Sequence, residues 1–482
     1  MASIIFYGVG RNAQENVEKW IDKGFSPVCF SDADTKKHYT KFQQWNVLPL
    51  LEAIRKYPDY ELYCTQNSSS LSQVRSFLLS VGIPDDRIHF FEEYVGNEIK
   101  TVSSLYPQLH TIYNALQDDL SRTLFWGRIQ YSLSHKLTGI YKAMICDDNM
   151  KWLMTKKTYA EIRYGLPGLW EALKENQPKQ KNKLFLMAFD EAWNEFEWVL
   201  DRFLEAMSEM NIIFSGCVMP YAKELPKVYK GIPCVSEEVF INSIDETTKV
   251  VVGIPGWCVE VRDVVERYAS IAGILYPIAD TAHPQYIETD FWTPQENEIF
   301  VDVGVYDLQN SIDFVQWAKN GFEKIYAFEP DPKGYEVATK KIKELPIFNN
   351  KIELINKGLS AKNGTLKFPA EYKGSGMHDG EFIDVEVVSL DSYLQGKPVT
   401  FVKMDVEGAE MDVLLGMQQT IALHKPKMAV CIYHNHQDIF EVATFLLSIV
   451  PQYHFYLRHY NSNETECVLF AYYDKAKELC GD

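Results

Sequence analysis

The amino-acid sequence predicts an α/β protein with a doubly wound, Rossmann-like sheet in its C-terminal part. Short apolar strands alternate with helical stretches along most of the 482 residues, which favours parallel βαβ units. Apolar runs end in a glycine at Gly304 and in a carboxylate at Glu329, and ligands bind at such strand ends in doubly wound sheets. The chain is also too long for one ordinary core, so roughly two to four domains are expected.

Residues 1–97 are expected to form a first, smaller Rossmann-like domain. Apolar strands with helical periods between them are expected at Ile4–Tyr7, Pro27–Phe30 and Glu61–Cys64. The first turn, Gly8-Val-Gly10-Arg-Asn-Ala13, fits the G-x-G-x-x-G/A pattern, and Asp32 and Asp34 end the second strand. The pattern indicates either a nucleotide or sugar-nucleotide site or a tight turn in a domain that docks a partner, and the sequence leaves both open.

A helical connector is expected at residues 98–180, where the pattern is helical and aromatic and ends in a polar stretch. Residues 181–285 then repeat the strand spacing and order of the first domain, which indicates a second, diverged Rossmann-like repeat. The glycine turn is lost there, because Phe189-Asp190-Glu191 stands in its place. The second repeat is therefore expected to have a structural role or to form a homodimer.

The final domain is expected at residues 286–482, with helices in the first five gaps between its strands. Seven strands are expected, at Ile299–Val303, Lys324–Glu329, Lys351–Ile355, Val399–Met404, Lys427–Tyr433, His454–Leu457 and Val468–Tyr472. The last strand follows Asn461–Glu466 with no room for a crossover helix. It should therefore pair antiparallel with its neighbours.

Chemistry-bearing residues fall at the expected carboxyl ends of these strands. They are Asp302, Gly304, Glu329, Asp405 and His434. The missing Cβ at Gly304 would let a ligand approach the backbone, and Glu329 would accept hydrogen bonds from both hydroxyls of a ribose. A nucleoside-bearing cofactor is therefore expected.

The order of these motifs resembles a known family. Phe-Val-Asp-Val-Gly304, Ala-Phe-Glu329-Pro, Val-Ser-Leu-Asp391, Val-Lys-Met-Asp405-Val-Glu-Gly-Ala-Glu, Cys-Ile-Tyr-His434 and Leu-Arg-His459 follow one another as in the FkbM-type S-adenosylmethionine-dependent methyltransferases. The resemblance implies a class I methyltransferase fold, S-adenosylmethionine as the cofactor, and O-methylation of a hydroxyl of a sugar, a glycan or a related hydroxylated metabolite.

The resemblance and the strand-end positions assign a set of residues to the cofactor. The set is Asp302, Gly304, Tyr306, Asp307, Ser311, Glu329, Asp331 and Asp405. Asp331 would reach the adenine edge, or it is only a turn residue before Pro332. Asp405 and Lys403 share one side of an extended strand end, so they would orient the sulfonium and amino group of the cofactor or hold the acceptor hydroxyl. Glu410 is expected to cap the following helix.

His434 is the preferred general base, and Asp405 and Lys403 complete the predicted catalytic set. The ordinary pKa of histidine lies near neutral pH, and a positioned base contributes roughly 10²–10⁴-fold to such a reaction. Asp405, His436 and His459 are the competing bases. His434-x-His436 with Asp438 also permits a metal, but no clear third ligand accompanies the two histidines, so no metal site is expected.

One position departs from the family pattern. The loop after the first strand usually reads Gly-x-x-x-Gly, and here Leu308 replaces the second glycine. A positive φ at a leucine costs roughly 1–2 kcal/mol, and the side chain would also crowd the methionine portion of the cofactor. The alternative function is therefore a non-catalytic nucleotide or sugar-nucleotide binding module with a degenerate methyltransferase domain. The glycine-rich segment Lys373–Gly380 is either an acceptor lid or a surface hairpin.

Composition narrows the partners. The formal net charge is −18, without a basic tract, which argues against nucleic acid and anionic membranes and leaves a small-molecule or glycan acceptor. Nine cysteines are scattered without a Cys-x-x-Cys pair, which indicates reduced thiols and a cytoplasmic protein. No signal peptide and no membrane-spanning apolar run are expected.

Overall fold

The chain forms two compact units, Met1–Pro107 with Asn435–Gln437 and Gln108–His434 with Asp438–Asp482. Each unit is described below by itself. The computed structural model describes residues 3–22, 24–65, 74, 78, 81, 83–84, 87–91, 102–146, 166–176, 179–189, 197–220, 222, 224–253, 272–275, 285–319, 321–348, 350–369 and 382–474.

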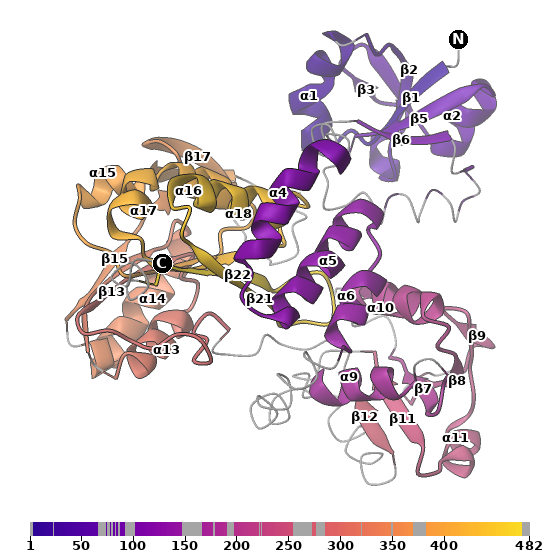
Figure 1. The fold of residues 1–482 in the computed structure, drawn as a ribbon. Coiled ribbons are helices and arrows are strands. Elements are labelled where there is room, and N and C mark those ends of the chain that lie inside the picture. Colours follow the sequence, from indigo (N-terminus) through magenta and orange to yellow (C-terminus); the bar gives the residue numbers. More distant parts are fainter. Residues whose placement is uncertain are drawn as a thin grey trace. The chain divides into compact units, whose positions relative to one another are not determined.

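The first unit contains a six-stranded sheet in the order β3-β4-β2-β1-β5-β6 (Figure 1). Its strands are β1 Ser3–Tyr7, β2 Pro27–Ser31, β3 Lys41–Phe42, β4 Trp45–Leu48, β5 Tyr60–Cys64 and β6 Ile88–Phe90, with helices α1 Arg11–Asp22 and α2 Leu50–Lys56. All neighbouring pairs are parallel except the β3–β4 hairpin. The three strands predicted from the apolar runs are present, and short pairing strands extend the sheet on both sides.

The turn after β1 is held by the end of β2. Gly8 has a φ of 107°, a conformation that glycine adopts without the steric cost of a side chain. One oxygen of Asp32 accepts a hydrogen bond from the backbone nitrogen of Val9 at 2.8 Å, and the other accepts one from the backbone nitrogen of Asp34 at 2.8 Å. The carboxylate at the end of the second strand therefore fixes the loop after the first strand.

The boundary between the units at Gln108 falls within helix α4 Val102–Ala115. The described helices that follow in the second unit are α5 Asp119–Ser134, α6 Thr138–Met144 and α9 Leu166–Glu175. Helix α5 packs on strand β21 His454–His459 of the C-terminal sheet, where the hydroxyl of Ser121 accepts a hydrogen bond from the backbone nitrogen of Leu457. Asp118 caps α5 and pairs with Arg458 at 2.6 Å. The connector is thus part of the support of the C-terminal sheet.

A four-stranded parallel sheet follows the helices, in the order β12-β11-β7-β8. Its strands are β7 Lys183–Met187, β8 Phe214–Val218, β11 Thr248–Val252 and β12 Gly273–Leu275, with helices α10 Glu197–Glu209 and α11 Glu237–Ser243 and the hairpin β9 Val228–Tyr229 and β10 Ile232–Pro233. The order matches that of β6-β5-β1-β2 in the first unit, and each second strand is followed by a hairpin. A duplication of one ancestral domain would give both sheets this shared topology. The duplication itself and the role of the second repeat in forming a homodimer stay predictions. Of the triplet 189–191, residues 190 and 191 lie outside the described residues.

The C-terminal sheet has seven strands in the order β15-β14-β13-β19-β20-β22-β21. They are β13 Glu298–Val303, β14 Phe322–Phe328, β15 Ile352–Ile355, β19 Phe401–Met404, β20 Lys427–Cys431, β21 His454–His459 and β22 Cys467–Tyr472. The first five in chain order are parallel, and β22 is antiparallel to both of its neighbours. The chain reverses its direction of winding between β13 and β19. This doubly wound order confirms the predicted fold class, including the antiparallel last strand.

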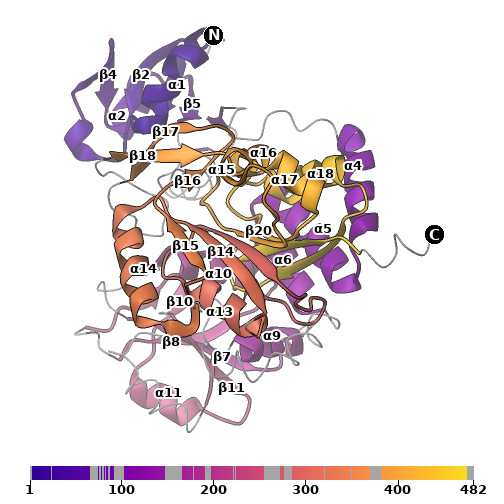
Figure 2. The same ribbon diagram turned by 90° about the vertical axis from the view of Figure 1, so that its left-hand side faces the viewer.

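Helices cover both faces of this sheet (Figure 2). Helices α13 Gln309–Trp317 and α14 Pro332–Glu344 pack on β13, β14 and β15, whereas α16 Glu410–Leu415, α17 Gln418–His424 and α18 Asp438–Ile449 pack together elsewhere on the domain. The core between α13 and the sheet is aromatic, and Phe300 stacks on Phe314 with ring centroids 4.3 Å apart. This core holds the strand ends, and so the site, in fixed positions.

The sequence did not predict a small sheet between β15 and β19. It consists of β16 Gly358–Leu359, β17 Gly364–Pro369 and β18 Phe382–Val388, followed by α15 Leu390–Leu394. The segment Lys373–Gly380, predicted as a lid or a hairpin, joins β17 and β18 and lies outside the described residues. Its role stays a prediction.

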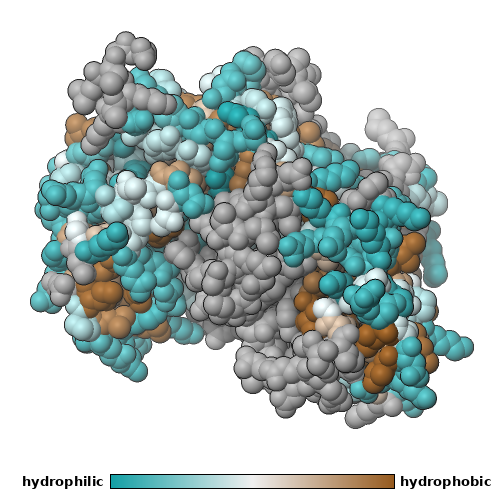
Figure 3. Space-filling view, turned by 60° about the horizontal axis from the view of Figure 1, so that its bottom comes forward, coloured by the Kyte–Doolittle hydropathy of each residue, from teal (hydrophilic) through white to brown (hydrophobic). Residues whose placement is uncertain are grey.

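On the face shown in Figure 3, hydrophilic residues predominate and hydrophobic residues form small separate patches. Within the described ranges, no helix has both the length and the apolar character that a bilayer span requires.

Candidate active site

The carboxyl ends of β14, β13, β19 and β20 form one edge of the C-terminal sheet, because these strands are parallel neighbours in that order. This edge brings together the predicted residues Glu329, Gly304, Asp405 and His434. Gly304 has a φ of 81°, and a Cβ there would lie 2.0 Å from the backbone oxygen of Asp405. Only glycine fits here, because the Asp405 backbone occupies the space of a side chain. The predicted reason for this glycine, approach of a ligand to the backbone, is therefore wrong, although the position lies at the switch point between β13 and β19.

Glu329 follows β14 and is almost fully buried. Its two oxygens each accept one backbone hydrogen bond at 2.9 Å, from Tyr306 and from Asp331. Burial raises the pKa of Glu329, although these two hydrogen bonds oppose the effect. A carboxylate has about four lone-pair positions, so Glu329 retains acceptor capacity for ribose hydroxyls.

The flanking acidic residues have structural roles in the described contacts. Asp331 caps α14 and accepts a hydrogen bond from the backbone nitrogen of Gly334 at 2.9 Å, which matches its interpretation as a turn residue. Asp307 accepts a hydrogen bond from the backbone nitrogen of Gln309 and lies 3.4 Å from the Lys341 ammonium. Contact of either carboxylate with a cofactor stays a prediction.

Tyr306 lies in the loop after β13, with a φ of 49° and a side chain that is 74% exposed. Its backbone nitrogen already binds Glu329. The loop is therefore fixed through its backbone, and the phenol is free to contact a ligand.

Lys403 lies beneath the edge and is 1% exposed. Its ammonium donates to the backbone oxygen of Gly304 at 2.5 Å and lies 3.7 Å from Asp302, which in turn accepts a hydrogen bond from Ser311 at 2.6 Å. Burial raises the pKa of Asp302, and the charge of Lys403 opposes this rise. Such complete burial favours support of the loop over direct contact with cofactor or acceptor. The predicted direct roles of Lys403, Asp302 and Ser311 stay predictions.

Asp405 follows β19 and is held from two sides. The hydroxyl of Tyr286 donates to one of its oxygens at 2.8 Å, and the hydroxyl of Tyr433 lies 3.5 Å from the other. Burial by itself disfavours this carboxylate, but the charges of Lys403 and His434 together hold the pKa of Asp405 below its ordinary value. Asp405 is therefore a preorganised negative charge at the switch point of the sheet.

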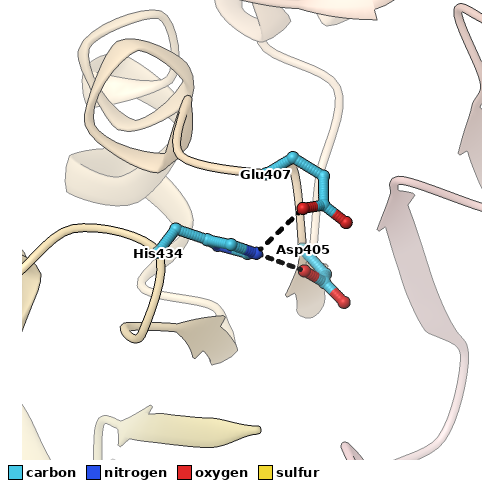
Figure 4. Close-up of side chains that lie close together, drawn as sticks. All are labelled: Asp405, Glu407 and His434. Atoms are coloured by element: carbon cyan, nitrogen blue, oxygen red, sulfur yellow. Dashed lines mark ion pairs between the residues drawn. The ribbon is translucent and has the colours of Figure 1, made fainter. Parts of the chain in front are cut away.

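His434 follows β20 and is surrounded by carboxylates (Figure 4). Its Nδ1 is 2.8 Å from Glu410, and its Nε2 is 3.4 Å from Glu407 and 3.7 Å from Asp405. Burial alone would lower the pKa of His434, but the three carboxylates outweigh burial and raise it to about 11. With no cation among these carboxylates, a histidine with this pKa is protonated at neutral pH and accepts no further proton. The predicted role of His434 as general base therefore does not fit this arrangement.

The competing histidines are no better placed for that role. His459 is 1% exposed, and burial together with the charge of Arg128 lowers the pKa of His459 to about 3. It lies at the end of β21, on an edge strand two positions from β20. His436 belongs to the segment Asn435–Gln437, which clusters with the first unit, and its role as a base stays a prediction.

Leu308 adopts the left-handed conformation, with a φ of 66° at the start of α13. The predicted backbone cost of roughly 1–2 kcal/mol therefore applies. The expected crowding of the cofactor is wrong, because the side chain is fully buried in the core cluster that contains Phe300 and Phe314. Packing of Leu308 in the core thus compensates for the absence of glycine, and the leucine side chain does not block the site.

Sequence reasoning missed several members of this cluster. Glu410 was expected to be only a helix cap, yet its carboxylate is fully buried and binds both His434 and the backbone nitrogen of Val406. Glu466 accepts a hydrogen bond from Gln285 at 2.6 Å, and burial with the charge of Asp405 raises the pKa of Glu466 to about 7. Tyr286 and Glu466 lie outside the motifs, so no local pattern marks them, whereas Glu410 ends a motif and only its contact with His434 was missed.

Comparisons with known proteins identify the C-terminal part. Residues 302–460 match the family model of the methyltransferase FkbM domain, so this part of the chain is similar to that family. Among solved structures, the methyltransferase FkbM from Methylobacillus flagellatus KT is similar at 14% identity over 98% of this chain and 90% of that chain, with a TM-score of 0.41.

Two further solved structures resemble only part of the chain. The O-methyltransferase from Bacillus cereus in complex with SAH shows 11% identity over 37% of this chain and 74% of that chain, with a TM-score of 0.25. Aeropyrum pernix fibrillarin with bound S-adenosyl-L-methionine shows 9% identity over 37% of this chain and 67% of that chain, with a TM-score of 0.25. No curated protein matches the chain.

Proposed function

We propose that residues 302–460 transfer a methyl group from S-adenosylmethionine to a hydroxyl of a sugar, a glycan or a related hydroxylated metabolite. The observation that carries this proposal is the row Glu329, Gly304 and Asp405 along one sheet edge, inside a domain that matches a methyltransferase family. The free thiols of the described cysteines support a cytoplasmic location, because disulfides are rare in that compartment.

In this proposal each strand end has its own task. Glu329 binds the ribose hydroxyls. Gly304 lets the loop after β13 pass close to the backbone of Asp405, and the methionine portion binds beside these two strand ends. The negative charge of Asp405 stabilises the cationic end of the cofactor or holds the acceptor hydroxyl. Correct placement of both reactants supplies ~7–11 kcal/mol of the barrier reduction, and this term does not require a protein base.

A methyl-transfer assay tests the proposal. The full chain is incubated with radiolabelled S-adenosylmethionine and a total extract of glycans and small hydroxylated metabolites. We expect label in products that survive mild alkali, because ethers resist base whereas methyl esters do not. Label found only in alkali-labile products would contradict O-methylation of a hydroxyl.

A second candidate function rests on the first unit. Asp32 binds the loop after β1 in the same way as Glu329 binds the loop after β13. Each carboxylate accepts one hydrogen bond from a backbone nitrogen in the loop and one from the backbone nitrogen two residues after the carboxylate itself. We propose that the turn Gly8–Ala13 binds a nucleotide or a sugar nucleotide. The parallel geometry of the two carboxylates supports this proposal.

Replacement of Gly10 tests the second candidate without disturbing the fold. A Cβ at Gly10 would meet no atom within 4 Å, so Gly10→Ala should fold normally. The added methyl would occupy the space through which a phosphate approaches the backbone. We expect UDP or ADP affinity to fall at least tenfold in calorimetric titration, while Gly364→Ala, which also adds a methyl in open space, changes nothing. Equal affinity in Gly10→Ala and the parent would refute the site.

A further inference from the structure

Three side chains at the proposed active site have the spacing of metal ligands. Asp405, Glu407 and His434 each offer one ligand atom, and these atoms lie within 4.8 Å of one another. The Nε2 atom of His434 is 3.4 Å from Glu407 and 3.7 Å from Asp405. Bonds of ~2.0–2.2 Å to one ion separate neighbouring ligand atoms by roughly 3–3.6 Å. The two separations from Nε2 lie in or next to this range.

The Nε2 atom of His434 supplies an independent indication of a ligand. This nitrogen is buried and makes no hydrogen bond, and the side chain as a whole is only 10% exposed. It points between the two carboxylates (Figure 4). An imidazolium paired directly with a carboxylate would approach to about 2.7–2.9 Å, and both observed distances are longer. The geometry therefore fits two ligands of one ion better than an ion pair.

The surrounding contacts orient these groups as in a metal site. The other ring nitrogen of His434 is 2.8 Å from the buried carboxylate of Glu410, and metal-binding histidines almost always bind a carboxylate or a carbonyl through that second nitrogen. The second oxygen of Asp405 accepts a hydrogen bond from Tyr286 at 2.8 Å. Both ligands are thus held by a second layer of hydrogen bonds.

We infer that Asp405, Glu407 and His434 bind a divalent first-row transition-metal ion of the Mn²⁺ or Zn²⁺ class. One imidazole and two carboxylates suit these ions better than Mg²⁺ or Ca²⁺, which prefer sets of oxygen ligands alone. The side chain of Glu407 is 55% exposed, so one side of the site faces solvent and can take exogenous ligands. This inference rests on the proposed function, in which an oxygen atom of the methyl acceptor binds the ion and completes its coordination sphere.

Manganese binding to the full chain tests this inference directly. Loss of the electron paramagnetic resonance signal of free Mn²⁺ measures affinity and stoichiometry without any methyl donor. We expect one ion per chain and coupling of the bound ion to one imidazole ¹⁴N nucleus. Glu407→Gln removes a ligand charge from a half-exposed position and should weaken binding at least tenfold. Glu336→Gln, an exposed change of the same kind on α14, should bind like the parent.

The outcomes separate this site from weaker explanations and from the proposed function. Binding that is the same in Glu407→Gln and the parent would identify an adventitious surface ion and overturn the inference. Bound Mn²⁺ without ¹⁴N coupling, or no binding by the parent at millimolar Mn²⁺, would overturn it as well. Because no cofactor is present, failure to bind S-adenosylhomocysteine would leave this result unaffected and would count only against the proposed function.

Discussion

Lys403→Met is expected to destabilise the C-terminal domain by about 3–5 kcal/mol, the cost of removing one partner from a buried charge pair. The Lys403 ammonium is the buried cation that opposes the raised pKa of Asp302 and lowers the pKa of Asp405. Methionine fills a similar volume, so the loss is electrostatic. Guanidinium unfolding followed by tryptophan fluorescence measures the effect, since Trp292 and Trp317 lie in the same core.

The pH dependence of this loss has a definite sign. Without Lys403, the pKa of Asp302 rises further above its unfolded value. A carboxyl group whose folded pKa is raised favours the folded state at low pH and disfavours it as the pH rises. The deficit of Lys403→Met should therefore be larger at pH 7.5 than at pH 5. Lys362→Met, a change at an exposed position, serves as the control. A Lys403→Met protein as stable as the parent at pH 7.5 would contradict this prediction and would show that the carboxyl groups of Asp302 and Asp405 are already neutral.

Glu329→Ala is expected to weaken binding of S-adenosylhomocysteine by ~1.5–3 kcal/mol, the range for hydrogen bonds to a charged group. This corresponds to a loss of roughly 10- to 150-fold in affinity. The substitution also leaves the backbone nitrogens of Tyr306 and Asp331 without their carboxylate partner, so the loop that contacts the cofactor loses its support.

Calorimetric titration of Glu329→Ala and of the exposed control Glu336→Ala gives the comparison. Thermal unfolding of both variants shows whether the domain remains folded. A folded Glu329→Ala protein that binds S-adenosylhomocysteine as tightly as the parent would make the ribose assignment wrong, and the cofactor would then have to lie elsewhere along the edge.

The sheet and its strand ends could be predicted because local sequence determines them. Apolar runs end in carboxylates at Glu329 and Asp405, and parallel neighbours necessarily present these ends at one edge. The segment Asn461–Glu466 before the last strand left no room for a crossover helix, which predicted that this strand is antiparallel. The small sheet β16–β18 was missed because β16 has only two residues, and β17 and β18 mix apolar with polar or charged residues, so they lack the continuous apolar run that marks the main strands.

The chemistry of His434 could not be predicted from its position alone. Its pKa depends on Glu407 and Glu410, which reach it through a turn where Glu407 and Gly408 both have positive φ angles. Tyr286 lies in the segment before the first strand and meets Asp405 only after the sheet has formed. For Leu308 the sequence showed a departure from glycine, but only the packing of α13 shows that the side chain enters the core.

Titration of the full chain with S-adenosylhomocysteine tests the central claim most directly, because the product binds wherever the cofactor binds and needs no acceptor. The account predicts saturable binding at one site per chain, despite Leu308 in the loop after β13. No detectable heat or protection from thermal unfolding at high protein and ligand concentration would contradict a cofactor site at the edge formed by Glu329, Gly304 and Asp405.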